Sequence, residues 1–164
     1  MIERFNLARR LLIVLVLMTV FTGNLLSQDV RRGWGYAYGG VGGTNQGNSV
    51  HAGGGGALLV AGGFGLEGEL AHHGATANHF DNSIRIISAN MAYHFKGRDL
   101  SKRLIPFATG GLSLADGRSG GGNFGFGIQY WAHERIAMRL EFREHIFSSD
   151  SPFIHGFHIG LAFR

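Results

Sequence analysis

The chain has 164 residues, enough for one domain or for one domain and a removable segment. Charged residues make up 16% of it, and the net charge of +4 gives no indication of a nucleic-acid partner. There are 28 glycines and no cysteine. The lack of cysteine excludes a disulfide scaffold, a thiolate metal site and a lipid-modified N-terminal cysteine. The abundant aliphatic and aromatic residues argue against a disordered chain.

Residues 1–27 have the pattern of a secretory signal peptide, with cleavage expected after Ser27. The apolar run 11–21 is too short to cross a bilayer as a helix, which needs about 20 apolar residues, although a membrane anchor is the competing interpretation. Three positive residues precede the run: Arg4, Arg9 and Arg10. A secreted protein works where ATP and nicotinamide cofactors are not freely supplied, so we expect no cofactor.

The remaining domain, 28–164, shows no convincing helical period. Apolar residues recur at every second position in runs of about ten residues, and pieces rich in turn-forming residues separate the runs. This pattern predicts eight β-strands, and eight strands with short connections fill the available length. The predicted strands are 32–42, 50–60, 63–73, 83–95, 104–115, 121–131, 134–147 and 152–163.

The seventh run carries the clearest alternation. Its apolar face holds bulky side chains interrupted only by Glu144, whereas the other face mixes charged residues with alanine and histidine. Bulky apolar side chains suit lipid, and a face of charges and small residues suits a narrow lumen. Strands in a bilayer must close so that every backbone group is paired. We therefore predict an eight-stranded antiparallel up-and-down transmembrane β-barrel.

Charged residues of the third and seventh runs would face each other across the lumen. An eight-stranded barrel is just wide enough to be filled by side chains, so we expect crossing arginine–carboxylate pairs with a structural role. A narrow ion path is the functional alternative. Ser88, Asn90, Gln129 and His158 could extend the network. The predicted pairs involve Glu67, Glu69, Arg139, Glu141 and Arg143.

Aromatic residues gather where odd strands begin and even strands end. If the N-terminus lies on the periplasmic side, these positions share one bilayer interface, where aromatic residues are enriched. The predicted periplasmic aromatic girdle consists of Trp34, Tyr36, Tyr93, Phe95, Tyr130, Trp131 and Phe163.

Four stretches of the C-terminal half, PFATGGL, NFGFGIQY, RLEFREHIF and IGLAFR, resemble the eight-stranded outer-membrane β-barrel family, the small OmpA/OmpX-like group. They lie at 106–112, 123–130, 139–147 and 159–164. The resemblance implies a fold and a location rather than a reaction. It also implies insertion by the barrel assembly machinery, which reads a terminal aromatic residue; here Phe163 is followed by Arg164.

Other candidate sites have simpler interpretations. The stretch 63–68 matches the glycine pattern of dinucleotide-binding loops, but no helix is expected after it, so we assign no nucleotide site. Neighbouring His72 and His73 should face opposite sides of a strand and are poor metal co-ligands. We expect the histidines near outer strand ends to be interfacial side chains rather than metal ligands. These are His51, His145 and His155.

A cluster at the outer end of the seventh strand raises the possibility of catalysis. Some eight-stranded outer-membrane barrels are lipid A deacylases with histidine, serine and an acidic residue at the rim. Here the spacing places Ser148 on the opposite face from His145, which does not favour a nucleophile–base pair. The cluster contains Glu144, His145, Ser148, Ser149 and Asp150.

These patterns predict a small, non-enzymatic, monomeric barrel in the bacterial outer membrane, with a structural or surface-interaction role and no pore for large solutes. Its expected partners are outer-membrane lipids, lipopolysaccharide and the assembly machinery, with no metal. A lipid A-modifying enzyme and a soluble periplasmic barrel that binds an apolar ligand are the alternatives.

Overall fold

The structure is a computed structural model. It describes residues 33–44, 47–75, 83–95, 103–117, 119–148 and 153–164. The predicted signal peptide, 1–27, lies outside the described residues.

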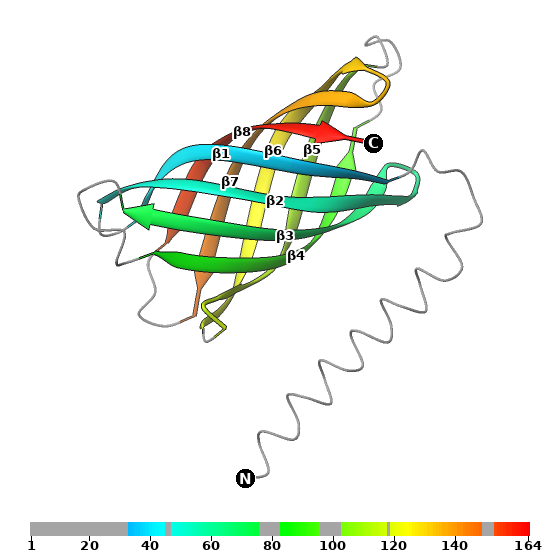
Figure 1. Ribbon diagram of the computed structural model, residues 1–164. Coiled ribbons are helices and arrows are strands. Elements are labelled where there is room, and N and C mark those ends of the chain that lie inside the picture. The colour runs from blue at the N-terminus through cyan, green and yellow to red at the C-terminus, as the bar shows by residue number, and fades with distance from the viewer. Residues whose placement is uncertain (1–32, 45–46, 76–82, 96–102, 118, 149–152) are drawn as a thin grey trace, which may run out of the picture. The chain divides into compact units, whose positions relative to one another are not determined.

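The described residues form one closed barrel in which each strand pairs antiparallel with its neighbours in sequence (Figure 1). Pairing of the first strand with the last, from Gly35 with Phe163 to Thr44 with Ile154, completes the closure. No helix in this part of the chain is long and apolar enough to cross a membrane. The strands are β1 (Gly33–Thr44), β2 (Gly47–Ala61), β3 (Phe64–Ala75), β4 (Ile84–His94), β5 (Leu104–Ala115), β6 (Ser119–His133), β7 (Ile136–Phe147) and β8 (Ile154–Phe163).

The prediction of eight antiparallel strands in a closed barrel is confirmed, and each predicted strand overlaps an observed one. The largest differences are at β2, which begins at Gly47 instead of 50, and at β6, which runs from Ser119 to His133 instead of from 121 to 131. Glycine and small polar residues at these ends are typical of turns, but in the structure they continue the hydrogen-bonded pairing of the strands. A register shift between Trp131 and His133 also adds a residue to β6.

Two tight turns connect strands through residues with positive φ. Gly62 and Gly63, between β2 and β3, have φ values of 59° and 97°. Asp116 and Gly117, after β5, have φ values of 45° and 68°. The loop between β2 and β3 has only these two residues, and hairpin loops of that length favour such backbones because their twist matches that of the flanking strands. The Asp116 carboxylate also accepts a hydrogen bond of 3.0 Å from the backbone N–H of Arg85, which ties this turn to β4.

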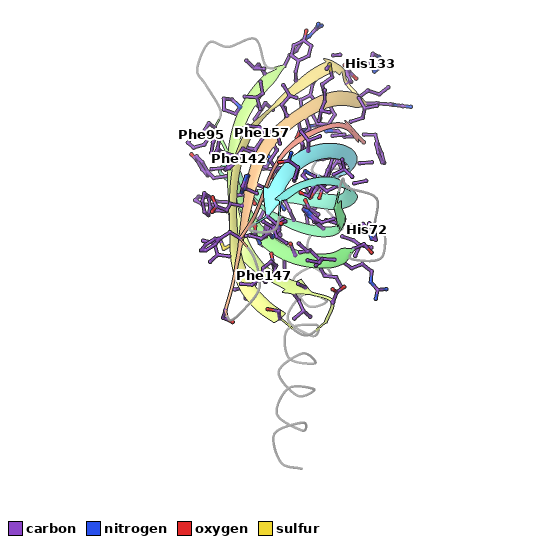
Figure 2. All side chains as sticks on the ribbon, turned by 90° about the vertical axis from the view of Figure 1, so that its left-hand side faces the viewer. His72, Phe95, His133, Phe142, Phe147 and Phe157 are labelled. Carbon is purple, nitrogen blue, oxygen red and sulfur yellow. The ribbon has the colours of Figure 1, made fainter. Side chains whose placement is uncertain are left out.

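The barrel is apolar outside and carries its buried charged side chains inside. On β7, Leu140 is 42% exposed, whereas Arg143, on the other face, is completely buried. Side chains project from the outer surface around the barrel, among them Phe95 and His72 (Figure 2). A soluble barrel has the opposite arrangement, because water solvates charges on its outside. This distribution is the one that lipid requires, and it agrees with the predicted transmembrane barrel.

The lipid-facing surface gives a direct test of the inside-out arrangement. Leu140 lies near the middle of β7 and faces outward. We predict that Leu140→Arg destabilises the barrel in lipid vesicles by about 2–4 kcal/mol, since a charged side chain would have to enter hydrocarbon. Urea unfolding of the vesicle-inserted protein measures this change. The control Leu140→Met keeps the volume and polarity and should cost less than about 1.5 kcal/mol. Equal effects of the two substitutions would contradict the assignment of this face to lipid.

Candidate functional site in the barrel lumen

A buried ion network crosses the middle of the barrel. Arg139 on β7 reaches over the lumen to Glu67 on β3, with Nη1 donating to Oε1 at 3.2 Å and Nη2 to Oε2 at 3.1 Å. Its Nε also donates to Oε2 of Glu141 at 3.0 Å. The two-pronged contact matches the planar guanidinium to the carboxylate, which is the geometry that makes such pairs strong. Glu67 and Arg139 thereby join opposite walls of the barrel.

The second arginine completes the network. Arg143 donates through Nε to Oε1 of Glu141 at 2.8 Å, and its Nη2 also contacts that oxygen. Its Nη1 lies 2.9 Å from Oε2 of Glu69, and its Nη2 lies 3.8 Å from Oε2 of Glu67. Each arginine therefore contacts carboxylates of β3 and β7. All five charged residues proposed from the sequence meet in this network, and all are buried.

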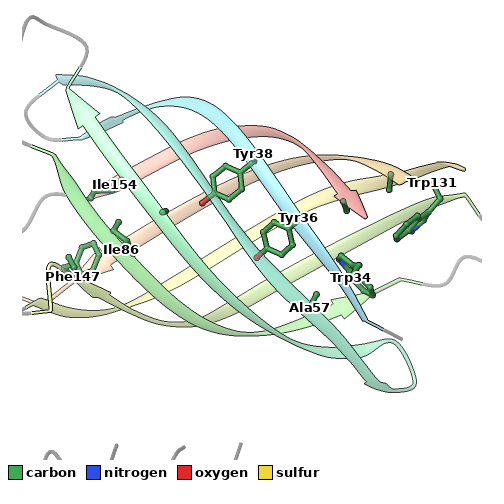
Figure 3. Packing of buried hydrophobic residues seen from close by; sticks show 12 residues of the cluster. Trp34, Tyr36, Tyr38, Ala57, Ile86, Trp131, Phe147 and Ile154 are labelled. Carbon is green, nitrogen blue, oxygen red and sulfur yellow. The ribbon is translucent and has the colours of Figure 1, made fainter. Parts of the chain in front are cut away.

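Two tyrosines add hydrogen bonds to Glu69. The hydroxyls of Tyr36 and Tyr38 on β1 donate to Oε2 and Oε1 of this carboxylate at 3.1 and 2.9 Å. Both rings point into the lumen from the wall (Figure 3). Gly53 and Gly55 on β2 make this possible, because a Cβ at either position would lie 2.6 or 2.8 Å from a tyrosine hydroxyl. The glycine-rich sequence of β2 thus creates the space that the tyrosines fill.

A layer of neutral hydrogen bonds lies beside the ions. Ser113 Oγ lies 3.0 Å from Ser88 Oγ and 2.9 Å from His145 Nδ1. Asn123 Nδ2 donates to Ser113 Oγ at 2.9 Å and to Asn90 Oδ1 at 2.8 Å. Ser88 and Asn90, which the sequence predicts to extend the ion network, make their hydrogen bonds in this neutral layer. The roles of Ser113 and Asn123 are not among the predictions from the sequence. Alternation along β5 and β6 places both residues on the lumen face, and this alternation is the sequence signal that identifies them as interior residues.

Apolar and aromatic side chains occupy both ends of the lumen. Trp34 and Trp131 meet edge to face, with ring centroids 6.3 Å apart, near the start of β1. Ile86, Phe147 and Ile154 lie at the opposite end (Figure 3). The described lumen is therefore filled by a polar centre between two apolar layers. Such filling is typical of eight-stranded barrels.

The predicted aromatic girdle is only partly on the outer surface. Trp34, Tyr36 and Trp131 point into the lumen and are buried, so the interpretation of these three as interfacial residues is wrong. The reason is parity: adjacent residues on a strand face opposite sides, so Tyr130 and Trp131 cannot both contact lipid. The remaining girdle residues lie at least partly exposed on the outward face. They are Tyr93, Phe95, Tyr130 and Phe163.

The rim cluster considered for catalysis does not assemble in the described residues. His145 points into the lumen, whereas Ser148 is exposed and donates from its Oγ to the carbonyl of Gly120 at 2.9 Å. Ser149 and Asp150 lie outside the described residues. The serine that does contact His145 is Ser113, and both are buried inside the wall. A nucleophile there is not accessible to a lipid on the outer surface.

The histidines differ from their expected positions in two cases. His72 and His155 are exposed on the outer face, whereas His51 and His145 are buried in the lumen. The expectation that His51 and His145 are interfacial is therefore wrong, because the parity of β2 and β7 turns both inward. Within the described ranges, no group of three or more histidine, aspartate or glutamate side chains is arranged to hold a metal ion. The glycine pattern at 63–68 continues directly into β3, without the helix that a dinucleotide site needs.

The ion network predicts that substitution of a buried arginine costs much more stability than substitution of an arginine on the surface. Arg143→Met should destabilise the barrel by about 3–5 kcal/mol, since Glu69 and Glu141 would lose a buried partner. Arg85 provides the control: its ion pair with Asp116, 3.8 Å between Nε and Oδ1, lies on the surface. Arg85→Met should cost no more than about 1 kcal/mol. Urea unfolding in detergent micelles, followed by tryptophan fluorescence, measures both. Similar costs for the two would argue against the lumen network as a main source of stability.

No family model and no curated protein matches this chain. Several solved structures share its fold. Neisserial surface protein A is 11% identical and has a TM-score of 0.63, with 80% of this chain and 94% of that protein covered. Ail, the attachment invasion locus protein of Yersinia pestis, is 12% identical, with a TM-score of 0.54 and the same coverage. A designed transmembrane β-barrel is 18% identical over 83% of this chain and 97% of the design, with a TM-score of 0.62. The chain therefore has the eight-stranded transmembrane β-barrel fold of small bacterial outer-membrane proteins.

Proposed function

We propose that this protein is a small integral barrel of the bacterial outer membrane with a structural or surface-interaction role, and that it is neither an enzyme nor a pore for large solutes. The observation that carries the proposal is the ion network of Glu67, Glu69, Arg139, Glu141 and Arg143, which fills the lumen and links opposite walls. A barrel closed in this way offers its outer surface and its loops for contacts.

The outer surface supports lipids as the principal partners. Bulky side chains from neighbouring strands pack together on it, as Phe142 does with Phe126 and Phe157 at centroid distances of 5.4 and 5.1 Å. Near the start of β3, Tyr93 contacts Phe64 and Phe95, at 4.8 and 4.9 Å. Aromatic residues at one level of a barrel favour a membrane interface, here the periplasmic one. Lipopolysaccharide would contact the opposite end.

The route to the membrane follows from the same proposal. A signal peptide over 1–27 would direct export, and the barrel assembly machinery would insert the domain of 28–164 as a monomer. Similar folds occur in proteins described as a surface protein and as an attachment invasion locus protein, which supports a role at the cell surface.

The proposal predicts a membrane-inserted barrel without large-solute permeability. The protein should remain in the outer-membrane fraction and should migrate differently on gels before and after boiling, because a closed barrel resists detergent unfolding. Vesicles that contain it should not swell in isotonic sugar, whereas vesicles with an open sixteen-stranded porin should. A water-soluble protein after export would contradict the location, and sugar-driven swelling would contradict the filled lumen.

Two cellular measurements separate the structural role from a lipid-modifying enzyme. Cells that lack the protein should become more sensitive to detergents, and expression of the chain should restore resistance. The mass of lipid A should be the same with and without the protein. A mass change that disappears in Ser148→Ala would instead support the enzyme.

A further inference from the structure

Three arginines lie together at the end of the barrel where β5 and β7 begin and β8 ends. The carbonyl of Arg103 accepts a hydrogen bond of 2.7 Å from the backbone N–H of Trp131, and the carbonyl of Arg135 accepts one of 3.0 Å from the backbone N–H of Arg164. The strands β5 to β8 are neighbours in the barrel, so these residues occupy one continuous part of its edge. All three arginines are exposed. We call Arg103, Arg135 and Arg164 the basic rim.

Two tryptophans support one member of the basic rim. The guanidinium carbon of Arg164 lies 3.8 Å from the ring centroid of Trp131 and 5.9 Å from that of Trp34. Both indole rings are buried in the lumen at this end of the barrel (Figure 3). The cation–π contact therefore holds the guanidinium at the mouth of the lumen. It uses the face of the guanidinium, whereas the N–H groups that recognise phosphate lie in its plane.

Positive charge exceeds negative charge at the basic rim. The side chains of Arg103 and Arg135 form no ion pair with any other described residue. The turn between β6 and β7 contributes one carboxylate, the exposed Glu134. At the opposite end of the barrel, Arg85 is instead paired with Asp116. Three guanidiniums and one carboxylate side chain leave the described part of the rim positive, and such a surface attracts anions.

The basic rim borders the apolar surface that contacts lipid. Ile136 directly follows Arg135, and Phe163 directly precedes Arg164; these two apolar residues are 51% and 54% exposed on the outer face. Successive residues of a strand are about 3.3 Å apart, whereas the headgroup layer on each side of the hydrocarbon core is about 5 Å thick or more. Arginine also has a long stem that lets its charged end reach the headgroups. The guanidiniums therefore lie at the level of the lipid phosphates.

We propose that Arg103, Arg135 and Arg164 bind the phosphates of anionic phospholipids, such as phosphatidylglycerol, in the inner leaflet of the outer membrane. The site rests on the proposed function, because that function places this end of the barrel on the periplasmic side. A planar guanidinium matches two oxygens of a phosphate. A lipid with a net negative charge neutralises the rim, whereas a zwitterionic lipid brings an ammonium group of its own. Glu134 opposes an anion, but the guanidiniums outnumber it.

The experiment uses the full protein in phosphatidylcholine vesicles that contain a trace of spin-labelled phosphatidylglycerol or spin-labelled phosphatidylcholine. Electron paramagnetic resonance measures the fraction of each labelled lipid that the protein immobilises. We expect the wild-type protein to immobilise phosphatidylglycerol more than phosphatidylcholine, and added salt to weaken this preference.

Substitutions assign the preference to one end of the barrel. Arg103→Gln, Arg135→Gln and Arg164→Gln should each lower the preference for phosphatidylglycerol by up to about fivefold, and the triple variant should lose it. Glu134→Gln should raise the preference, because it removes the carboxylate beside the rim. Arg85→Gln is the matched control: it removes an exposed arginine at the opposite end, and it should leave the preference unchanged.

Equal immobilisation of the two lipids by the wild-type protein would overturn the proposal. An equal loss of preference in Arg85→Gln and Arg135→Gln would also overturn it, since the attraction would then come from overall charge. Displacement of the labelled lipid by soluble glycerol phosphate would do the same, because the rim would then be a site for free phosphate. The shift in gel migration on boiling shows whether each variant is folded, and the single variants decide the outcome if the triple variant does not fold.

Insertion into vesicles of phosphatidylcholine alone separates this inference from the proposed function. A protein that does not insert would contradict the membrane barrel itself. A protein that inserts but shows no preference for phosphatidylglycerol would contradict only the lipid site at the basic rim.

Discussion

The pairing of buried charges across the lumen is the interaction on which this structure depends. A closed barrel in lipid has no water at its surface to solvate arginine or glutamate, so charged side chains must point inward and find partners there. Arg139 meets Glu67 on the opposite wall, and Arg143 meets Glu69 and Glu141. Each arginine is held by carboxylates from β3 and β7, which fixes the relative position of these two strands. The same pairs fill the cross-section of the lumen. One set of contacts therefore both stabilises the barrel and occupies its interior.

Glycine residues in the barrel wall make room for the side chains that fill the lumen. A barrel of eight strands is narrow, and tyrosine, tryptophan and histidine rings cannot share its lumen unless some wall positions carry no side chain. Gly53 and Gly55 accommodate the hydroxyls of Tyr38 and Tyr36, and Gly40 and Gly156 accommodate His51. The tyrosines then reach Glu69, and the histidines reach one another. At these four positions glycine therefore relieves crowding inside the barrel.

Structures with the same fold are only 10–18% identical to this chain. The physical requirements explain this tolerance, because closure, alternation and paired lumen charges can be met by many residue combinations. The lumen is accordingly where each such protein can differ while its outer surface remains apolar. In this chain the lumen also holds four buried histidines, His51, His73, His145 and His158.

Alternation and turn residues were sufficient to predict eight strands, the closed antiparallel barrel and the inward face of β7, because the contrast between Leu140 and Arg143 is visible in the sequence. The five residues of the ion network could be named for the same reason. Parity was not decidable on glycine-rich β1 and β2, where neither face is distinctly apolar, and so Trp34 and Tyr36 were placed on the wrong side. Contacts between distant strands depend on the stagger of the whole barrel, which no single segment encodes. Only the tertiary structure therefore decided that Ser113 holds His145 and that His51, His73 and His158 meet.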